Sequence, residues 1–413
     1  MSEPSTRRRT SVVVVALGAL YLAQGIPFGF ATQYLPVVLR ESGMSYAGIA
    51  ALSWLQLPWQ LKIFWAKAAD HPALRARTRF VVLAMQLALT ATVAAFALRP
   101  LRSAPTLWFV LTFVAAALAA TQDVFVDAYA VRVLRPEERG FGNTAQVAGY
   151  RVGMLVGGAA LLLVVTSLGE PATLLACAGV VAVTSVGAFA GSAEIDPANA
   201  EPPANGERVQ EAIGMRALAK HALGRETWVV LAMAMTFKLG LHMASSLVKP
   251  MAVDHGWTKH QIGAAVVTVG SVAALVGAAA GGAMHRALRE RRALTIAMLL
   301  QALVCAPLVL VEYLHAPIGL TTVVIALEHF GSGLGTTVLF AALMTATRPA
   351  NAGVHYTVLT SANALAIGFG GLLGGICADV AGKVVTFSAA TVICLVPAVL
   401  LSRWDDAARA SRA

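Results

Sequence analysis

Long apolar runs constrain this chain more than any other feature of its sequence. Twelve stretches of about 20 residues are apolar enough to cross a bilayer. In hydrocarbon every backbone amide must find its hydrogen bond inside the protein, so runs of this length are helices. The sequence therefore predicts an all-α membrane protein with 12 transmembrane helices. The predicted spans are residues 12–38, 46–68, 80–98, 104–130, 143–166, 172–192, 227–250, 259–284, 293–311, 318–346, 355–378 and 384–402.

Composition agrees with this class. Hydrophobic residues make up 58% of the chain and charged residues 13%, which is more apolar surface than a soluble domain can hide. The apolar run after the N-terminal arginines continues into further spans, so we interpret it as the first helix rather than a removable signal. The four cysteines have no paired spacing and predict neither a disulfide framework nor a metal site; we expect no cofactor. They are Cys177, Cys305, Cys377 and Cys394.

The positive charge of the chain is placed asymmetrically. If both termini are cytoplasmic, 22 of the 31 Lys and Arg residues lie in cytoplasmic segments, five in outer loops and four inside helices. That bias follows the positive-inside rule and predicts the orientation. We therefore interpret the net charge of +10 as topology and contact with lipid headgroups, not as a nucleic-acid surface.

One long polar segment divides the chain. Residues 193–226 are rich in Pro, Ala, Asn and Glu, which is typical of a flexible linker. It separates six predicted spans from six others. We therefore expect an N-terminal bundle of residues 1–192, a cytoplasmic linker, and a C-terminal bundle of residues 227–413.

The two halves share an internal repeat. A shift of 213 residues places Arg135–Pro136 on Arg348–Pro349, and the same shift places Gly157–Gly158 on Gly370–Gly371. Parallel repeats of this kind are typical of transporters whose halves are related by an axis along the membrane normal. The repeat predicts two pseudo-symmetric six-helix bundles.

A basic loop follows the second span and has a counterpart after the eighth. In the first copy the charged residues include Asp70, Arg75 and Arg79. Simple anchoring by the positive-inside rule explains these charges.

Charged residues interrupt the fourth and fifth spans. Asp123 and Asp127 are spaced i, i+4 and project from one helix face, which makes them candidates for proton coupling. Depth along the two helices places Asp123 and Arg151 at a similar level, so we predict an ion pair between them. That pair is either structural or one that opens during transport or releases a proton.

The seventh span carries a basic stripe. Lys238, His242 and Lys249 fall on essentially one helix face, which predicts attraction for an anionic substrate. Lys249 is near the outer end, where interface anchoring is an alternative.

Glu328 and His329 form the titratable pair of the tenth span. A carboxylate beside a histidine at mid-depth is a candidate proton carrier. The alternative is a structural glutamate satisfied by Lys238.

Further polar residues are candidate substrate contacts. Tyr21 and Gln24 lie in the first span, where Pro27 predicts a kink beside a cavity. Lys62 in the second span is a substrate contact or a snorkelling lysine, and Asn363 lies in the eleventh span.

Five stretches carry a family resemblance: YLAQGIPFG (21–29), LPWQLKIFWAKAAD (57–70), ATQDVFVDAYAVRVLRPEERGFGN (120–143), GYRVGM (149–154) and EHFGSGLGTTVLFAALM (328–344). Together they resemble the AmpG-type muropeptide permease and acetyl-coenzyme A transporter branch of the major facilitator superfamily. The resemblance implies alternating-access transport driven by protons, with the QD…D segment, Lys62 and Arg151 as functional candidates. It also implies a gating latch at the cytoplasmic ends of the helices, for which Asp70, Arg75 and Arg79 are candidates, with simple anchoring as an equal alternative. The chain departs from that branch at Lys67, where relatives usually have Pro, and it is shorter than well-known muropeptide permeases.

We therefore expect a monomeric, proton-coupled secondary transporter in a bacterial inner membrane. Its solute would be anionic and of medium size, such as a muropeptide. A siderophore or an acyl-coenzyme A-like anion is the alternative cargo, and a receptor that binds without transporting is the alternative class. The sequence contains no ordered set of nucleophile, base and metal ligands, so we do not expect an enzyme.

Overall fold

The chain is helical throughout the part that the structure describes. The computed structural model describes residues 3–65, 68–69, 71–133, 139–191, 228–346 and 352–412, and these contain helices and no strands. Ten of its helical stretches are long and apolar enough to cross a membrane, and each matches a predicted span. They are Ser11–Glu41, Thr78–Leu98, Pro105–Ala130, Ala148–Leu168, Trp228–Asp254, Lys259–Ala287, Glu290–Leu314, Ile318–Thr345, Val358–Ala381 and Lys383–Leu401.

The other two predicted spans are also helical but differ in detail. The span at 172–192 corresponds to α10 (Glu170–Gly191). The span at 46–68 is not one continuous α-helix. It is broken into α3 (Tyr46–Ala50), η2 (Ala51–Gln56), α4 (Leu57–Leu61) and η3 (Lys62–Phe64), of which η2 and η3 are 3₁₀-helical. Pro58 lies in the first turn of α4, where a missing backbone N–H is tolerated, so the α-helix restarts there.

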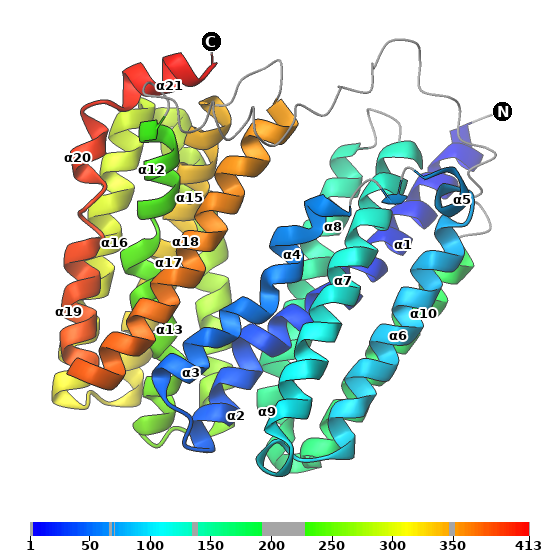
Figure 1. The fold of residues 1–413 in the computed structure, drawn as a ribbon, viewed down its shortest axis with the longest axis horizontal. Helices are drawn as coiled ribbons and strands as arrows, with labels where there is room; N and C mark the ends of the chain where they lie inside the picture. Colours follow the sequence, from blue (N-terminus) through cyan, green and yellow to red (C-terminus); the bar gives the residue numbers. More distant parts are fainter. Residues whose placement is uncertain are drawn as a thin grey trace. The chain divides into compact units, whose positions relative to one another are not determined.

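The described helices group into two compact units (Figure 1). Unit 1 comprises Met1–Ser42 and Trp54–Arg208, and unit 2 comprises Gly43–Ser53 and Val209–Ala413. The linker predicted at residues 193–226 lies outside the described residues. The short segment Gly43–Ser53 groups with unit 2, although it lies within the predicted N-terminal bundle.

Unit 1 is built around the contact of α1 with α8. A Cβ atom at Gly153 of α8 would collide with the carbonyl oxygen of Leu22, so glycine allows the two backbones to approach closely. The elements not yet named are α1 (Glu3–Gly29), η1 (Phe30–Tyr34), α2 (Leu35–Glu41), α5 (Pro72–Arg75), α6 (Thr78–Ala95), η5 (Phe96–Leu98), η6 (Leu101–Ser103), α7 (Pro105–Val133), α8 (Arg139–Leu155), η7 (Val156–Ala160) and α9 (Leu161–Leu168).

The first span departs from regular geometry after the predicted kink. Helix α1 continues past Pro27 to Gly29, and a π-helical turn, η1, follows. The N–H of Leu35 donates to the carbonyl of Phe30, which is the i→i+5 pattern. Pro36 directly follows and has no N–H for an α-helical bond, so the wider turn lies where that bond is missing.

Unit 2 uses the same kind of close contact between α15 and α17. A Cβ atom at Gly333 would collide with the carbonyl oxygen of Ala274. Helix α18 packs against α13, α12 and α3. The elements not yet named are α12 (Trp228–Thr236), α13 (Leu239–Asp254), α14 (Lys259–Gln261), η10 (Ile262–Val269), α15 (Gly270–Ala287), α16 (Glu290–Leu314), α17 (Ile318–Thr345), α18 (Ala352–Ala381), α19 (Lys383–Ile393), α20 (Ala398–Leu401) and α21 (Trp404–Arg412).

The turns between helices confirm the internal repeat. Gly43 and Gly256 both have a positive φ, at 84° and 76°, and they are 213 residues apart. Gly169 and Gly382, at 79° and 85°, have the same separation. Only glycine adopts this backbone region without strain, so the equivalent turns of the two halves keep the same residue.

Candidate functional site

An ion pair lies inside unit 1. The Lys62 Nζ atom, at the start of η3, donates to the Asp123 Oδ2 atom of α7. Asp123 is 4% exposed, whereas a third of the Lys62 side chain is exposed. The acid of this ion pair is therefore buried and its lysine is partly accessible. The Lys62 amine also lies 5.5 Å from the centre of the Trp59 ring, within the range of a cation–π contact.

Asp127 lies one turn further along α7 and has different partners. The Tyr21 hydroxyl donates to its Oδ1 atom at 2.5 Å, and the Gln146 Nε2 atom is 3.4 Å from the same oxygen. The two acids therefore lie on one face, as predicted, but among the described residues only Asp123 has a lysine partner. Sequence reasoning had missed Gln146.

The predicted ion pair between Asp123 and Arg151 is wrong. Arg151 is exposed on α8, and Lys62 holds the Asp123 carboxylate. Gly149 and Gly153 define the face of α8 that packs on α1. Arg151 is two residues from each, about 200° around the helix, so it points away from that face.

Three glutamines of unit 1 are fully buried, namely Gln24, Gln86 and Gln122. The Gln122 Nε2 atom lies 3.5 Å from the Leu20 carbonyl oxygen. Gln24 is 0% exposed, and neither of its amide atoms has a hydrogen-bond partner among the described residues. A buried amide without a partner is costly, so Gln24 remains a candidate for binding a polar solute group.

The predicted cytoplasmic latch is only partly visible. Asp70 lies outside the described residues. Arg75 is exposed, and Arg79 is exposed with its guanidinium 4.9 Å from the Phe80 ring centre.

The break between α12 and α13 presents a buried cation in unit 2. Lys238 is 1% exposed at this break. Its Nζ atom donates to the Ser332 carbonyl oxygen at 2.9 Å and to the Ser332 hydroxyl at 3.2 Å. Lysine has three N–H donors and both of these acceptors are neutral, so one donor and the charge remain for another group.

Glu328 of α17 is a buried acid of unit 2, also 1% exposed. The Ser245 hydroxyl donates to its Oε1 atom, and the His329 Nδ1 atom is 2.7 Å from its Oε2 atom. The same histidine nitrogen lies 3.0 Å from the Ile325 carbonyl oxygen, which requires a proton on Nδ1. Lys238 interacts electrostatically with Glu328, as in the structural alternative, but its hydrogen bonds go to Ser332.

The basic residues of the seventh span lie within electrostatic range of Glu328. His242 lies within electrostatic range of Lys238, Glu328, Lys249 and His329. We call Lys238, His242, Ser245, Glu328, His329 and Ser332 the unit 2 cluster. Asn363 of α18, the remaining predicted contact, is 2% exposed and its Oδ1 atom has no partner among the described residues.

Two serines of this cluster were missed from the sequence. Ser245 is three residues after His242, and Ser332 is four residues after Glu328. Both therefore follow a predicted site residue on the same helix face, and that spacing is the signal that could have found them.

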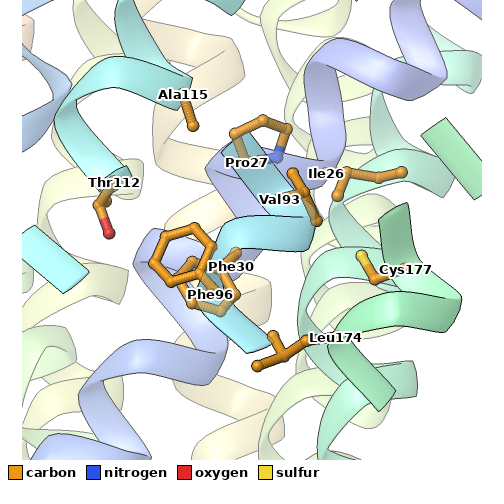
Figure 2. Close-up of a pocket in the computed structure, with 9 residues that line it drawn as sticks. All are labelled: Ile26, Pro27, Phe30, Val93, Phe96, Thr112, Ala115, Leu174 and Cys177. Carbon is orange, nitrogen blue, oxygen red and sulfur yellow. The ribbon is translucent and has the colours of Figure 1, made fainter. Parts of the chain in front are cut away.

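A small cavity in unit 1 is unrelated to these clusters. Figure 2 shows it between Pro27, Phe30, Phe96 and Leu174, and its lining is almost wholly apolar. The one hydroxyl there, Thr112, already donates to the Trp108 carbonyl oxygen at 2.8 Å. The cavity cannot recognise a charged solute. Among the described residues, no three His, Cys, Asp or Glu side chains are grouped to hold a metal ion.

Comparison with known proteins identifies the family. A family model described as "Major Facilitator Superfamily" matches residues 17–325 and 230–413. The chain belongs to the major facilitator superfamily. It is a multi-pass membrane transporter and not an enzyme.

Curated relatives from this superfamily carry more specific names. The chain is 26% identical over 363 residues to "Putative transporter AmpG 4" of Rickettsia conorii, covering 84% of this chain and 85% of the relative. It is 26% identical over 398 residues to "Anhydromuropeptide permease" of Escherichia coli K12, covering 95% of this chain and 78% of the relative.

Solved structures share the major facilitator fold. A bacterial homolog of the human lysosomal transporter Spinster matches with a TM-score of 0.70 and 14% identity, covering 100% of this chain and 99% of that structure. A D-xylose–proton symporter matches with a TM-score of 0.65 and 12% identity, covering 95% and 96%. At these identities the likeness concerns the fold alone.

Proposed function

We propose that this chain is a proton-coupled importer or exchanger of a medium-sized anionic solute, of which a muropeptide is the best candidate. We further propose that it acts as a monomer in a bacterial inner membrane with both termini cytoplasmic. The observation that carries the proposal is Lys238, a buried cation whose hydrogen bonds go to neutral oxygen atoms.

The charge at Lys238 supports an anionic solute. A cation at membrane depth is expensive unless an opposite charge meets it for part of the time. His242 interacts electrostatically with Lys238 and adds a titratable group near it, and Glu328 is the acid within electrostatic range of both. An anionic group arriving at Lys238 would gain a charge-assisted hydrogen bond without displacing a hydrogen-bonded carboxylate.

The pairing at Glu328 supports proton coupling. Its two oxygen atoms meet a serine hydroxyl, which donates a hydrogen bond, and a histidine, which can accept or release a proton. A proton on Glu328 would break the ionic contact with His329, so protonation and solute charge are coupled within one cluster. Lys62 and Asp123 form a second ion pair, which a proton on Asp123 would break in the same way.

The muropeptide identity rests on the named relatives. One relative of Escherichia coli is called an anhydromuropeptide permease, and the alignment covers 95% of this chain. Such a solute is anionic and larger than a monosaccharide, which agrees with the buried lysine.

Binding tests the proposal most simply. The purified protein should be stabilised against heat by an anhydromuropeptide, since a ligand that binds only the folded state raises the unfolding temperature. The Lys238→Ala variant should lose this stabilisation. Arg409→Ala is the matched control, because the Arg409 side chain is 71% exposed and forms an ion pair with the exposed Asp406 on the same helix. Equal stabilisation of Lys238→Ala and the control would contradict the proposed site.

A further inference from the structure

A short segment from the first half of the chain groups with unit 2. Residues 43–53 pack with unit 2, whereas α2 before them and α4 after them belong to unit 1. The segment is therefore tethered to unit 1 through the chain at both ends and held on unit 2 by its contacts. Figure 1 shows α3, its helical part, beside the end of α18.

A carboxylate of α18 caps the start of α3. The backbone N–H of Tyr46 donates to the Asp379 Oδ1 atom at 3.0 Å, and the N–H of Ala47 donates to Oδ2 at 2.8 Å. The Ser45 side chain accepts from the N–H of Gly48 at 3.1 Å. The first-turn N–H groups of a helix have no partner within the helix and form a positive end, so Asp379 satisfies two of them with a matching charge.

The Tyr46 side chain makes a second contact with unit 2. Its hydroxyl donates to the Asp254 Oδ2 atom at the end of α13. The Lys383 amine of α19 lies 3.2 Å from the same oxygen and 2.8 Å from the Glu312 Oε1 atom. His255 completes the network, with its Nε2 atom 3.0 Å from Glu312 Oε2. The segment thus docks on a network of charged groups from three helices.

Close packing accompanies these polar contacts. A Cβ atom at Gly375 of α18 would lie 2.6 Å from the Tyr46 carbonyl oxygen, so glycine is needed for this approach. Irregular backbone bounds the segment on both sides. Gly43, its first residue, has a φ of 84°, and the 3₁₀-helical η2 begins within its last three residues. A 3₁₀ stretch within a longer helix often marks a hinge.

We propose that Asp379 and Asp254 form a releasable latch, which holds residues 43–53 on unit 2 in one state of the transport cycle and frees them in another. Major facilitator transporters work by rocking one half against the other. Because both flanks of the segment belong to unit 1, rocking would strain this contact, and the irregular backbone at Gly43 and η2 would let the segment separate from α18. The latch is suited to release, since Asp379 is exposed and water can replace its carboxylate at the first-turn N–H groups. The proposal rests on family membership and not on the identity of the solute.

Reagent access to a buried position tests the latch. Ala50 of the segment is 8% exposed, so Ala50→Cys in a background with Cys177, Cys305, Cys377 and Cys394 replaced by Ala should react slowly with a water-soluble maleimide. The protein is purified whole and placed in lipid nanodiscs. Asp379→Ala should raise the reaction rate about fivefold, the usual effect of losing a helix cap. Asp379→Asn, which keeps one acceptor oxygen, should give an intermediate rate.

A disulfide within unit 2 tests whether the Asp379→Ala variant is still correctly folded. An ideal Cβ atom at Gly282 of α15 lies 3.8 Å from Thr337 Cγ2 of α17, so Gly282→Cys with Thr337→Cys should cross-link within unit 2. Unchanged cross-linking of this pair in Asp379→Ala shows that the fold is intact. If it changes, Tyr46→Phe decides instead, because that variant removes a single hydroxyl. Equal reaction of Ala50→Cys with and without the deciding substitution overturns the latch.

A second disulfide tests release directly. An ideal Cβ atom at Gly368 lies 3.7 Å from Ser53 Oγ, so Ser53→Cys with Gly368→Cys should lock the segment on α18. Oxidation should stop anhydromuropeptide uptake and reduction should restore it, while the oxidised control pair still transports. Uptake at full rate by the locked protein overturns the latch. If neither the wild type nor any variant takes up the anhydromuropeptide, the result counts against the proposed solute. The maleimide rates then decide whether the latch exists.

Discussion

Removing the lysine of the Lys62–Asp123 pair should destabilise unit 1 measurably. In Lys62→Met, the Asp123 carboxylate, whose side chain is 6% exposed, loses its ionic partner. Breaking a buried pair from one side typically costs about 3–5 kcal/mol. Because a third of the Lys62 side chain is exposed, water compensates in part, and we expect about 2 kcal/mol. For a unit of this size that corresponds to a fall in unfolding temperature of roughly 4–8 °C.

A buried cysteine reports this unfolding. Cys177 is the buried cysteine of unit 1, so in a background with Cys305, Cys377 and Cys394 replaced by Ala a fluorogenic maleimide reacts only as this unit unfolds. The double variant Lys62→Met with Asp123→Asn should recover most of the loss, since it removes both charges together. Arg151→Met should change the unfolding temperature little, because Arg151 is exposed. Additive losses in the double variant, or a larger loss for Arg151→Met than for Lys62→Met, would refute the pairing.

Three further predictions concern other parts of the molecule. Gly153→Val should prevent α8 from packing on α1, because even a Cβ atom there meets the Leu22 carbonyl oxygen. We expect this variant to lose the monodisperse peak in size-exclusion chromatography. Gly179→Val, at a position with open space around it, should behave as wild type. Thr258→Ala removes a capping box at the start of α14 and should lower stability by about 1 kcal/mol, measured by thermal unfolding; an unchanged unfolding temperature would show that the cap is dispensable. Ser245→Ala removes a hydroxyl that donates to Glu328 and should shift the pH dependence of transport, whereas Ser388→Ala, at an exposed serine, should not; identical pH profiles for both would argue against a role for Ser245.

The sequence predicted the architecture well because membrane helices have a strong local signature. Ten described helices match predicted spans, and the offset between halves reappears in the paired turns at Gly43 and Gly256. Apolar length and turn chemistry depend on neighbouring residues only, so a single sequence carries them.

Side-chain partners were harder to predict. Depth along a helix placed Asp123 and Arg151 at the same level, but depth says nothing about the direction in which each side chain points. The glycines of α8 determine that direction, and they turn Arg151 away. Lys62 reaches Asp123 from a broken helix whose irregular backbone the hydrophobic pattern does not reveal.

The contacts of residues 43–53 could not be inferred from the sequence. The segment lies in the first half of the chain, yet its cap, Asp379, comes from the second half, 333 residues away from Tyr46. No local pattern links two residues at that separation. Their pairing follows only from the fold.

Uptake by Glu328→Gln tests the proposed coupling most directly. Proteoliposomes that contain the wild type should accumulate an anhydromuropeptide when a proton gradient is imposed, and a protonophore should abolish the accumulation. Glu328→Gln keeps the size of the side chain and loses its titratable proton. We predict that this variant still exchanges solute across the membrane when both sides contain it, but no longer accumulates it against a gradient. Accumulation by Glu328→Gln at the wild-type level would contradict the role of Glu328.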